Sequence, residues 1–161
     1  MTNKKLIIFD FDGVLIHTSL LPQKLHRTIP EEMKILIREL NENYLLAIVS
    51  ASEYSTISDF LETQNIRNSF VGILGGNSNG EKAAKIAQLL REYEIAPQYT
   101  IMITDTTGDV REARECSVQS IAVTWGFYDR ERLRRAEPAY YVDTVQELEH
   151  AIETYFLEPR P

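Results

Sequence analysis

The chain has 161 residues, of which 43% are hydrophobic and 25% charged, and its formal net charge is -7. A chain of this length supports one globular core, so we expect one domain over residues 1–157 and a frayed tail over residues 158–161. The acidic balance argues against a general nucleic-acid surface or a membrane surface. The N-terminus shows no secretory apolar region, no apolar stretch has membrane length, and the single cysteine cannot form an internal disulfide, so cytoplasmic residence is the default expectation.

Short apolar runs rich in β-branched residues recur along the chain and predict buried strands. They lie at residues 6–9, 45–49, 70–74, 100–104, 120–124 and 139–142. Most intervals between them carry apolar residues at helical spacing, and the first helix is expected to begin at a capping box formed by Thr28 and Glu31. This alternation predicts an α/β fold: a single Rossmann-like, three-layer α/β/α domain with a mostly parallel sheet of about five or six strands.

Two acids stand directly after the first predicted strand, in the stretch LIIFDFDGVL. Asp10 and Asp12 are separated by one residue, and alternate residues of a strand point the same way, so both are expected beyond the carboxyl edge of the sheet. At about 4 Å and an effective dielectric of roughly 20, two such charges repel by about 4 kcal/mol. A cation, a proton or a chemical task should therefore accompany the pair.

Polar residues also follow the later strands. Ser50 ends the second strand, Lys82 opens the helix after the third, and the fourth ends in Asp105 with Asp109 four residues further on. Because the carboxyl ends of parallel strands meet at one edge, these side chains are expected to lie together. Several acids, a hydroxyl and a lysine suit a divalent cation with a phosphate, and oxygen ligands of this kind suit Mg²⁺.

This order of motifs resembles the haloacid dehalogenase superfamily of phosphotransferases. The resemblance extends from DFDGVL through Ser50 and Lys82 to DTTGD, and the C-terminal third looks like the phosphoglycolate phosphatase-like branch. It implies a phosphatase that hydrolyses phosphate monoesters with Mg²⁺.

The same resemblance implies a role for each residue. Asp10 would be the nucleophile that forms an aspartyl phosphate, and Asp12 would be the general acid for the leaving oxygen and then the base for water. The resemblance also implies that Ser50 and Lys82 bind the phosphate. Asp10, Asp105 and the backbone carbonyl of Asp12 would bind the metal, and Asp109 would lie close behind Asp105. Asp12 must change protonation between the two half-reactions, and crowding beside Asp10 is the expected means.

Three rival interpretations use the same residues. A phosphate-binding P-loop fits the glycines at residues 75–80, but Glu81 separates them from Lys82 and no Ser or Thr follows that lysine. A receiver-like phospho-aspartate switch shares the architecture, but its acceptor acid should end the third strand, and FVGILGG contains none. A non-catalytic relative that binds a partner stays an alternative because Thr104 stands where the family usually has glycine.

The chain leaves little room for the cap domain that many members of this family carry. A loop, one helix and one strand account for the residues between Asp12 and Ser50, and a helix, a strand and a Gly-rich loop for those between Ser50 and Lys82. We therefore expect no cap domain and an open site. The substrate would be a phosphorylated small molecule or a phosphorylated macromolecule.

Such a site needs a cover that limits water and orients the substrate. A second subunit of a homo-oligomer or a bulky substrate could supply it. The nearest apolar side chains for this contact are Leu20, Leu21 and Leu25, and His17 lies just past the acid pair.

Overall fold

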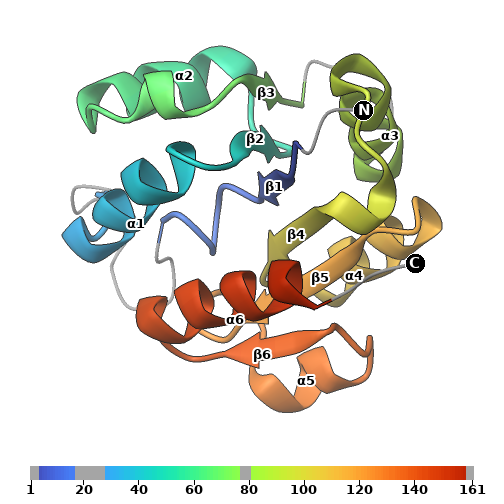
Figure 1. The fold of residues 1–161 in the computed structure, drawn as a ribbon. Coiled ribbons are helices and arrows are strands. Elements are labelled where there is room, and N and C mark those ends of the chain that lie inside the picture. The colour runs from blue at the N-terminus through green and yellow to red at the C-terminus, as the bar shows by residue number, and fades with distance from the viewer. Residues whose placement is uncertain (1–3, 17–27, 77–80, 159–161) are drawn as a thin grey trace.

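The computed structural model describes residues 4–16, 28–76 and 81–158. Strands and helices alternate along these residues (Figure 1). The strands are β1 (Leu6–Phe9), β2 (Leu45–Val49), β3 (Gly72–Leu74), β4 (Thr100–Thr104), β5 (Gln119–Val123) and β6 (Tyr140–Val142). The α-helices are α1 (Glu31–Asn41), α2 (Tyr54–Thr63), α3 (Lys82–Tyr93), α4 (Thr107–Glu115), α5 (Arg130–Arg134) and α6 (Val145–Leu157), with 3₁₀ turns η1 (Arg67–Ser69) and η2 (Pro97–Tyr99).

These strands form one parallel sheet in the order β3-β2-β1-β4-β5-β6. β1 lies in the middle, where Phe9 pairs with Ile48 of β2 on one side and Ile103 of β4 on the other. The chain first extends the sheet through β2 and β3 and then returns to continue on the other side from β4. This reversal places a ligand crevice at the carboxyl ends of β1 and its neighbours. The predicted fold class is confirmed.

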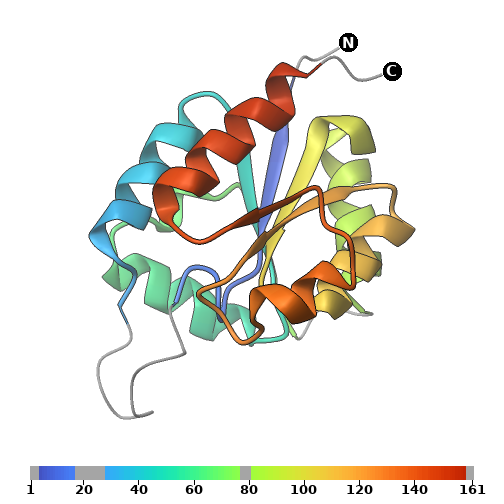
Figure 2. The same cartoon turned by 90° about the horizontal axis from the view of Figure 1, so that it is seen from below.

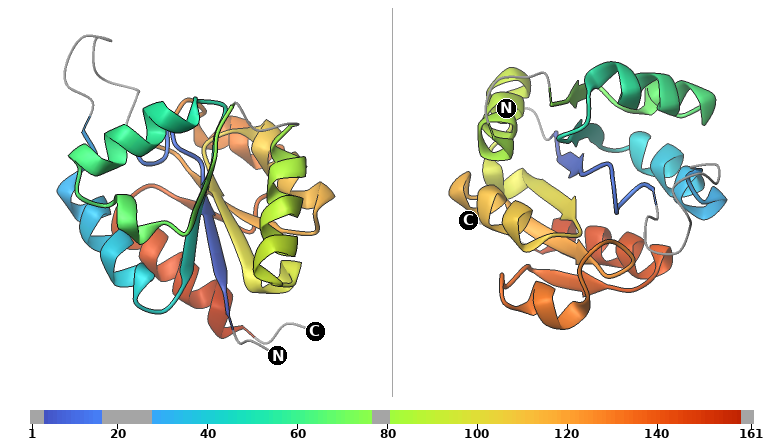
Figure 3. Two further views of the ribbon diagram at one scale, coloured as in Figure 1. Left: turned by 90° about the horizontal axis from the view of Figure 1, so that it is seen from above. Right: turned by 180° about the vertical axis from the view of Figure 1, so that it is seen from behind.

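β1 is buried on both faces, as a central parallel strand must be. Ile7 and Phe9 pack in the cluster that contains side chains of α1, α2 and α6, whereas Leu6 and Ile8 pack with side chains of α3 and α4. Figures 2 and 3 show these two groups of helices on opposite sides of the sheet. Each layer therefore fixes one face of the strand that leads into the acid pair.

Two local predictions were wrong. The capping box of Thr28 and Glu31 does not form, because α1 begins at Glu31 and its N-cap is Pro30, with no side-chain cap. Proline lacks the backbone N–H that a reciprocal capping box requires. The third strand is shorter than residues 70–74, because the 3₁₀ turn η1 runs to Ser69 and the residues paired with β2 begin at Gly72.

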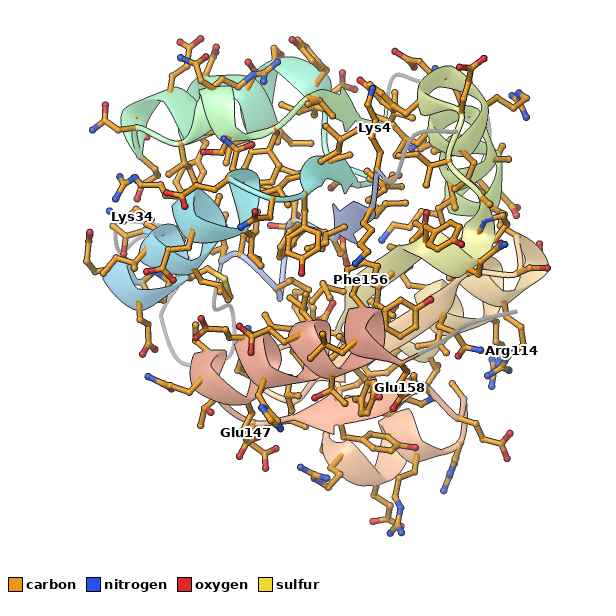
Figure 4. The ribbon with its side chains drawn as sticks, in the orientation of Figure 1. Lys4, Lys34, Arg114, Glu147, Phe156 and Glu158 are labelled. Carbon is orange, nitrogen blue, oxygen red and sulfur yellow. The ribbon has the colours of Figure 1, made fainter. Side chains whose placement is uncertain are left out.

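Aromatic side chains of α6 pack near the amino end of β1. Phe156, on the side of α6 that faces the sheet, stacks on Tyr44 with 5.1 Å between ring centroids (Figure 4). The Tyr155 hydroxyl donates to the Thr100 carbonyl at 3.0 Å. Within the three described ranges, no helix combines the length and apolar character that a bilayer crossing needs.

The two intervals in which the sequence predicted no room for a cap domain contain core elements where they are described. α1 and β2 lie between Asp12 and Ser50, and α2, η1 and β3 lie between Ser50 and Lys82. Residues 17–27 and 77–80 lie outside the described residues, and so do His17 and the three leucines expected to contact a cover. The absence of a cap and the domain boundaries stay predictions.

Candidate active site

Three neighbouring strands supply the centre of the site. Asp10, Ser50 and Asp105 are the first residues after β1, β2 and β4, and β1 lies between the other two strands. The hydrogen bonding of the sheet continues through Asp10 and Ser50. The Asp10 N–H donates to the Ile103 carbonyl and the Ser50 N–H to the Leu74 carbonyl, both at 3.0 Å. The backbone of the acid and of the serine is therefore fixed by the sheet itself.

Lys82 joins two carboxylates. Its Nζ lies 3.1 Å from Asp10 Oδ1 and 2.7 Å from Asp109 Oδ2. Burial lowers the pKa of Lys82, but Asp10 and Asp109 more than offset this, and the pKa is raised overall. The ammonium group is therefore held charged at the edge of the sheet.

Asp10 is buried and surrounded by charge. Burial raises the pKa of its carboxyl well above the usual range, Lys82 opposes the shift, and Asp109 and Asp105 add to it. Its Oδ1 also accepts a hydrogen bond from the Phe11 N–H at 2.8 Å. Ionised Asp10 therefore needs more positive charge nearby than Lys82 alone supplies.

Asp105 is fully buried, and only one of its oxygens is satisfied. The Phe127 N–H donates to Oδ2 at 2.8 Å, whereas Oδ1 has no hydrogen-bond partner among the described residues. Burial raises the pKa of Asp105, and the Phe127 hydrogen bond only partly offsets this. A Cβ at Gly13 or at Gly126 would collide with the Asp105 carboxylate, so both glycines leave space for it.

These features fit a divalent cation. A buried carboxylate oxygen without a donor is costly, and a metal ion would satisfy it. Within the described residues, no three His, Cys, Asp or Glu side chains come together as a metal-binding group. The expected ligand set is consistent with that, because it consists of two carboxylates, Asp10 and Asp105, and the Asp12 backbone carbonyl. Mg²⁺ commonly keeps several waters and needs few protein ligands.

Thr104, in the position where glycine is usual, has polar contacts on both sides of its hydroxyl. Oγ1 donates to Asp109 Oδ2 at 2.8 Å, the same oxygen that Lys82 contacts, and accepts from the Thr106 N–H at 3.2 Å. Thr106 is the N-cap of α4 and accepts from the Asp109 N–H at 3.3 Å. Thr104 therefore helps to hold the carboxylate that holds Lys82.

Asp12 lies on the other side of the site, where its Oδ2 accepts a hydrogen bond from Ser52 Oγ at 2.9 Å. The carboxylates that raise the pKa of Asp10 are Asp109, on the first turn of α4, and Asp105, directly after β4. The expectation that crowding beside Asp10 serves the proton transfer by Asp12 stays a prediction.

Ser50 contacts its own loop. Its Oγ accepts from the Ser52 N–H at 3.1 Å, and its carbonyl accepts from the buried Nζ of Lys85 at 3.1 Å. Among the described contacts, no hydrogen bond joins Ser50 to Asp10 or to Lys82. Sequence reasoning missed Ser52 and Lys85. The available signals were a second serine two residues after Ser50 and a lysine within the apolar stripe of α3.

The comparisons with known proteins agree with this arrangement. A family model described as haloacid dehalogenase-like hydrolase matches residues 22–123, which is more than half of the chain. A phosphoglycolate phosphatase from Synechococcus elongatus is 29% identical over 123 residues, covering 76% of this chain and 58% of that relative. The chain thus spans less than two thirds of that relative's length.

Two solved structures share the fold. A haloacid dehalogenase-like hydrolase from Streptococcus pneumoniae gives a TM-score of 0.80 at 25% identity, covering 94% of this chain and 100% of that chain. A 3-deoxy-D-manno-octulosonate 8-phosphate phosphatase from Moraxella catarrhalis, solved with magnesium and phosphate ions, gives a TM-score of 0.71 at 18% identity, covering 94% and 87%.

Proposed function

Because the chain belongs to the haloacid dehalogenase-like hydrolase family, we propose that it is a Mg²⁺-dependent phosphatase that hydrolyses phosphate monoesters through an aspartyl phosphate on Asp10. The observation that carries the proposal is the ion-paired group of Lys82 with the buried Asp10 and Asp109, beside the unsatisfied Oδ1 of Asp105. The relatives support the reaction class: one is a phosphoglycolate phosphatase, and the Moraxella phosphatase holds magnesium and phosphate.

The reaction has two half-reactions. In the first, a carboxylate oxygen of Asp10 bonds to phosphorus and the ester P–O bond breaks, its electron pair going to the leaving oxygen, which takes a proton from Asp12. In the second, Asp12 takes a proton from water, whose oxygen bonds to phosphorus. The bond from phosphorus to Asp10 then breaks and returns its electron pair to the carboxylate, releasing inorganic phosphate.

The remaining residues would bind the metal ion and the phosphoryl oxygens. Asp10, Asp105 and the Asp12 backbone carbonyl would hold Mg²⁺, which would screen the repulsion between the Asp10 carboxylate and a phosphate dianion. Lys82 would contact the phosphoryl oxygens from α3, and Ser50 would contact them from the end of β2. Asp109 keeps Lys82 directed towards Asp10.

The substrate class in this proposal is a phosphorylated small molecule or macromolecule, and a second subunit would cover the site for a small one. Sedimentation velocity at several protein concentrations tests whether the protein self-associates. A strictly monomeric protein that turns over one small phosphate ester with kcat/KM above roughly 10⁵ M⁻¹s⁻¹ would contradict the proposal that a second subunit covers the site. That value lies in the usual range for enzymes, so the monomer alone would then form a complete active site.

The activity itself is tested with the purified protein and 4-nitrophenyl phosphate. We expect hydrolysis that EDTA abolishes and Mg²⁺ restores, with Asp10→Asn, prepared in parallel, as the control for contaminating phosphatases. No turnover over a broad panel of phosphate esters would contradict the proposal. A long-lived aspartyl phosphate without turnover would instead indicate a phospho-aspartate switch.

A further inference from the structure

Ser52 contacts the side chain of Asp12. Its Oγ donates to Asp12 Oδ2 at 2.9 Å, across 40 positions of sequence. Ser52 is not one of the residues that the sequence pattern assigned to nucleophile, acid, phosphate or metal. It lies in the half-buried loop between β2 and α2, where a serine needs no polar partner other than water.

Three hydrogen bonds among the described residues hold the main chain of the loop that carries Ser52. The Ser52 N–H donates to Ser50 Oγ at 3.1 Å, and the Gly76 N–H donates to the Ser52 carbonyl at 2.7 Å. The Ser50 carbonyl, two residues before Ser52, accepts from the buried Nζ of Lys85 at 3.1 Å. The loop that positions the Ser52 hydroxyl is thus tied to Ser50 just after β2, to Gly76 just after β3 and to Lys85 of α3.

We infer that Ser52 is a positioning residue for Asp12 that orients its carboxyl group for proton transfer to the leaving oxygen. The inference rests on the proposed function, because it concerns the acid step of that reaction. A hydroxyl suits this role, since it can donate to an ionised carboxylate and accept from a protonated one. Its hydrogen bond with Asp12 therefore persists in both half-reactions.

Leaving groups differ in how much they need this proton. When the P–O bond of an alkyl phosphate breaks, the electron pair goes to an alkoxide oxygen that must be protonated at the same time. A 4-nitrophenolate oxygen is stable without the proton. In the half-reaction that forms the aspartyl phosphate, a residue that orients the acid should therefore matter for alkyl esters and hardly matter for the nitrophenyl ester.

The experiment compares Ser52→Ala, Ser52→Thr and the wild-type protein on n-propyl phosphate and 4-nitrophenyl phosphate. For Ser52→Ala we expect kcat/KM, which reports the formation of the aspartyl phosphate and not its hydrolysis, to fall about tenfold or more on the alkyl ester and to stay within about threefold of wild type on the nitrophenyl ester. Ser52→Thr keeps the hydroxyl and should restore most of the alkyl activity. Ser55→Ala removes an exposed hydroxyl at the start of α2 and should change neither rate.

Equal losses of kcat/KM on the two esters, or no loss on either, would overturn the inference, because a loosened loop acts on both substrates alike. Crystal structures of the wild type and Ser52→Ala give a second readout that needs no turnover. We expect the Asp12 carboxyl to change orientation in the variant, and an unchanged orientation would also overturn the inference. Failure of the proposed function is recognised separately, as a wild-type protein that hydrolyses neither ester.

Discussion

On the α3 side of the site, Lys82 lies between the carboxylates of Asp10 and Asp109, whereas on the β2 side Asp12 is bonded to the neutral hydroxyl of Ser52. On the first side the carboxylates of Asp10 and Asp109 are buried and Lys82 is half-buried. On the second side Asp12 is half-buried, and the contact described for its carboxylate is with a hydroxyl, which carries no charge.

This difference matches two chemical demands. A phosphoryl group carries negative charge throughout the reaction, so fixed positive charge in a buried setting stabilises it most. A general acid and base must gain and lose a proton in each cycle, and a fixed ammonium group beside it would favour the ionised form. A hydroxyl can stabilise the orientation without that bias.

The largest effect is expected from Asp10→Asn. The amide cannot accept the phosphoryl group, so turnover and the aspartyl phosphate should both be lost, a fall of about 10⁴-fold or more in kcat. Steady-state rates and acid-quenched labelling with a ³²P-labelled ester measure the two losses. Wild-type turnover by this variant would show that the nucleophile is elsewhere.

Asp12→Asn should cost less and should depend on the leaving group. Removal of general acid and base assistance typically costs about 10² to 10⁴ in rate. We expect the upper part of this range for n-propyl phosphate and a smaller loss for formation of the aspartyl phosphate from 4-nitrophenyl phosphate. Burst kinetics with the nitrophenyl ester separate the two half-reactions. If Asp12→Asn lost as much activity as Asp10→Asn on every ester, the proposed difference in role between the Lys82 side and the Asp12 side of the site would be wrong.

Lys82→Met tests the charged side through both activity and stability. Without the ammonium group, kcat/KM should fall about 10² to 10³, as for removal of one donor to a developing anion. The free energy of unfolding should fall by about 3 kcal/mol, because the buried carboxylates of Asp10 and Asp109 lose their charged partner. Urea unfolding measures the second effect.

Lys34→Met is the matched control for that variant. Lys34 lies on α1 and contacts the exposed Glu31 at 3.2 Å (Figure 4). Such surface pairs contribute about 0 to 1 kcal/mol, so activity should be unchanged and stability nearly so. A Lys82→Met protein that matched this control in both measurements would contradict the role of Lys82.

The sequence predicted the frame of this site better than its contacts. Strand ends carry the polar residues, and a parallel sheet brings those ends to one edge, so the places of Asp10, Ser50 and Asp105 followed from spacing alone. The Lys85 contact with Ser50 and the Ser52 contact with Asp12 depend on how loops cross that edge. Serine and lysine have many ordinary surface roles, so neither residue type indicated these partners.

The smallest effect is expected from Thr104→Val, which keeps the side-chain shape and removes the hydroxyl. Thr104 Oγ1 bonds to the same Asp109 oxygen as Lys82, so its loss should let Lys82 and Asp109 shift together. Inhibition by inorganic phosphate should weaken about threefold to tenfold, as for loss of one hydrogen bond to a charged group, with kcat changed less. Thr104→Ser keeps the hydroxyl and should bind phosphate like the wild type. If Thr104→Val and Thr104→Ser give the same inhibition constant for phosphate, the Thr104 hydroxyl contributes only to packing. Lys82 and Asp109 would then bind phosphate without help from that hydroxyl.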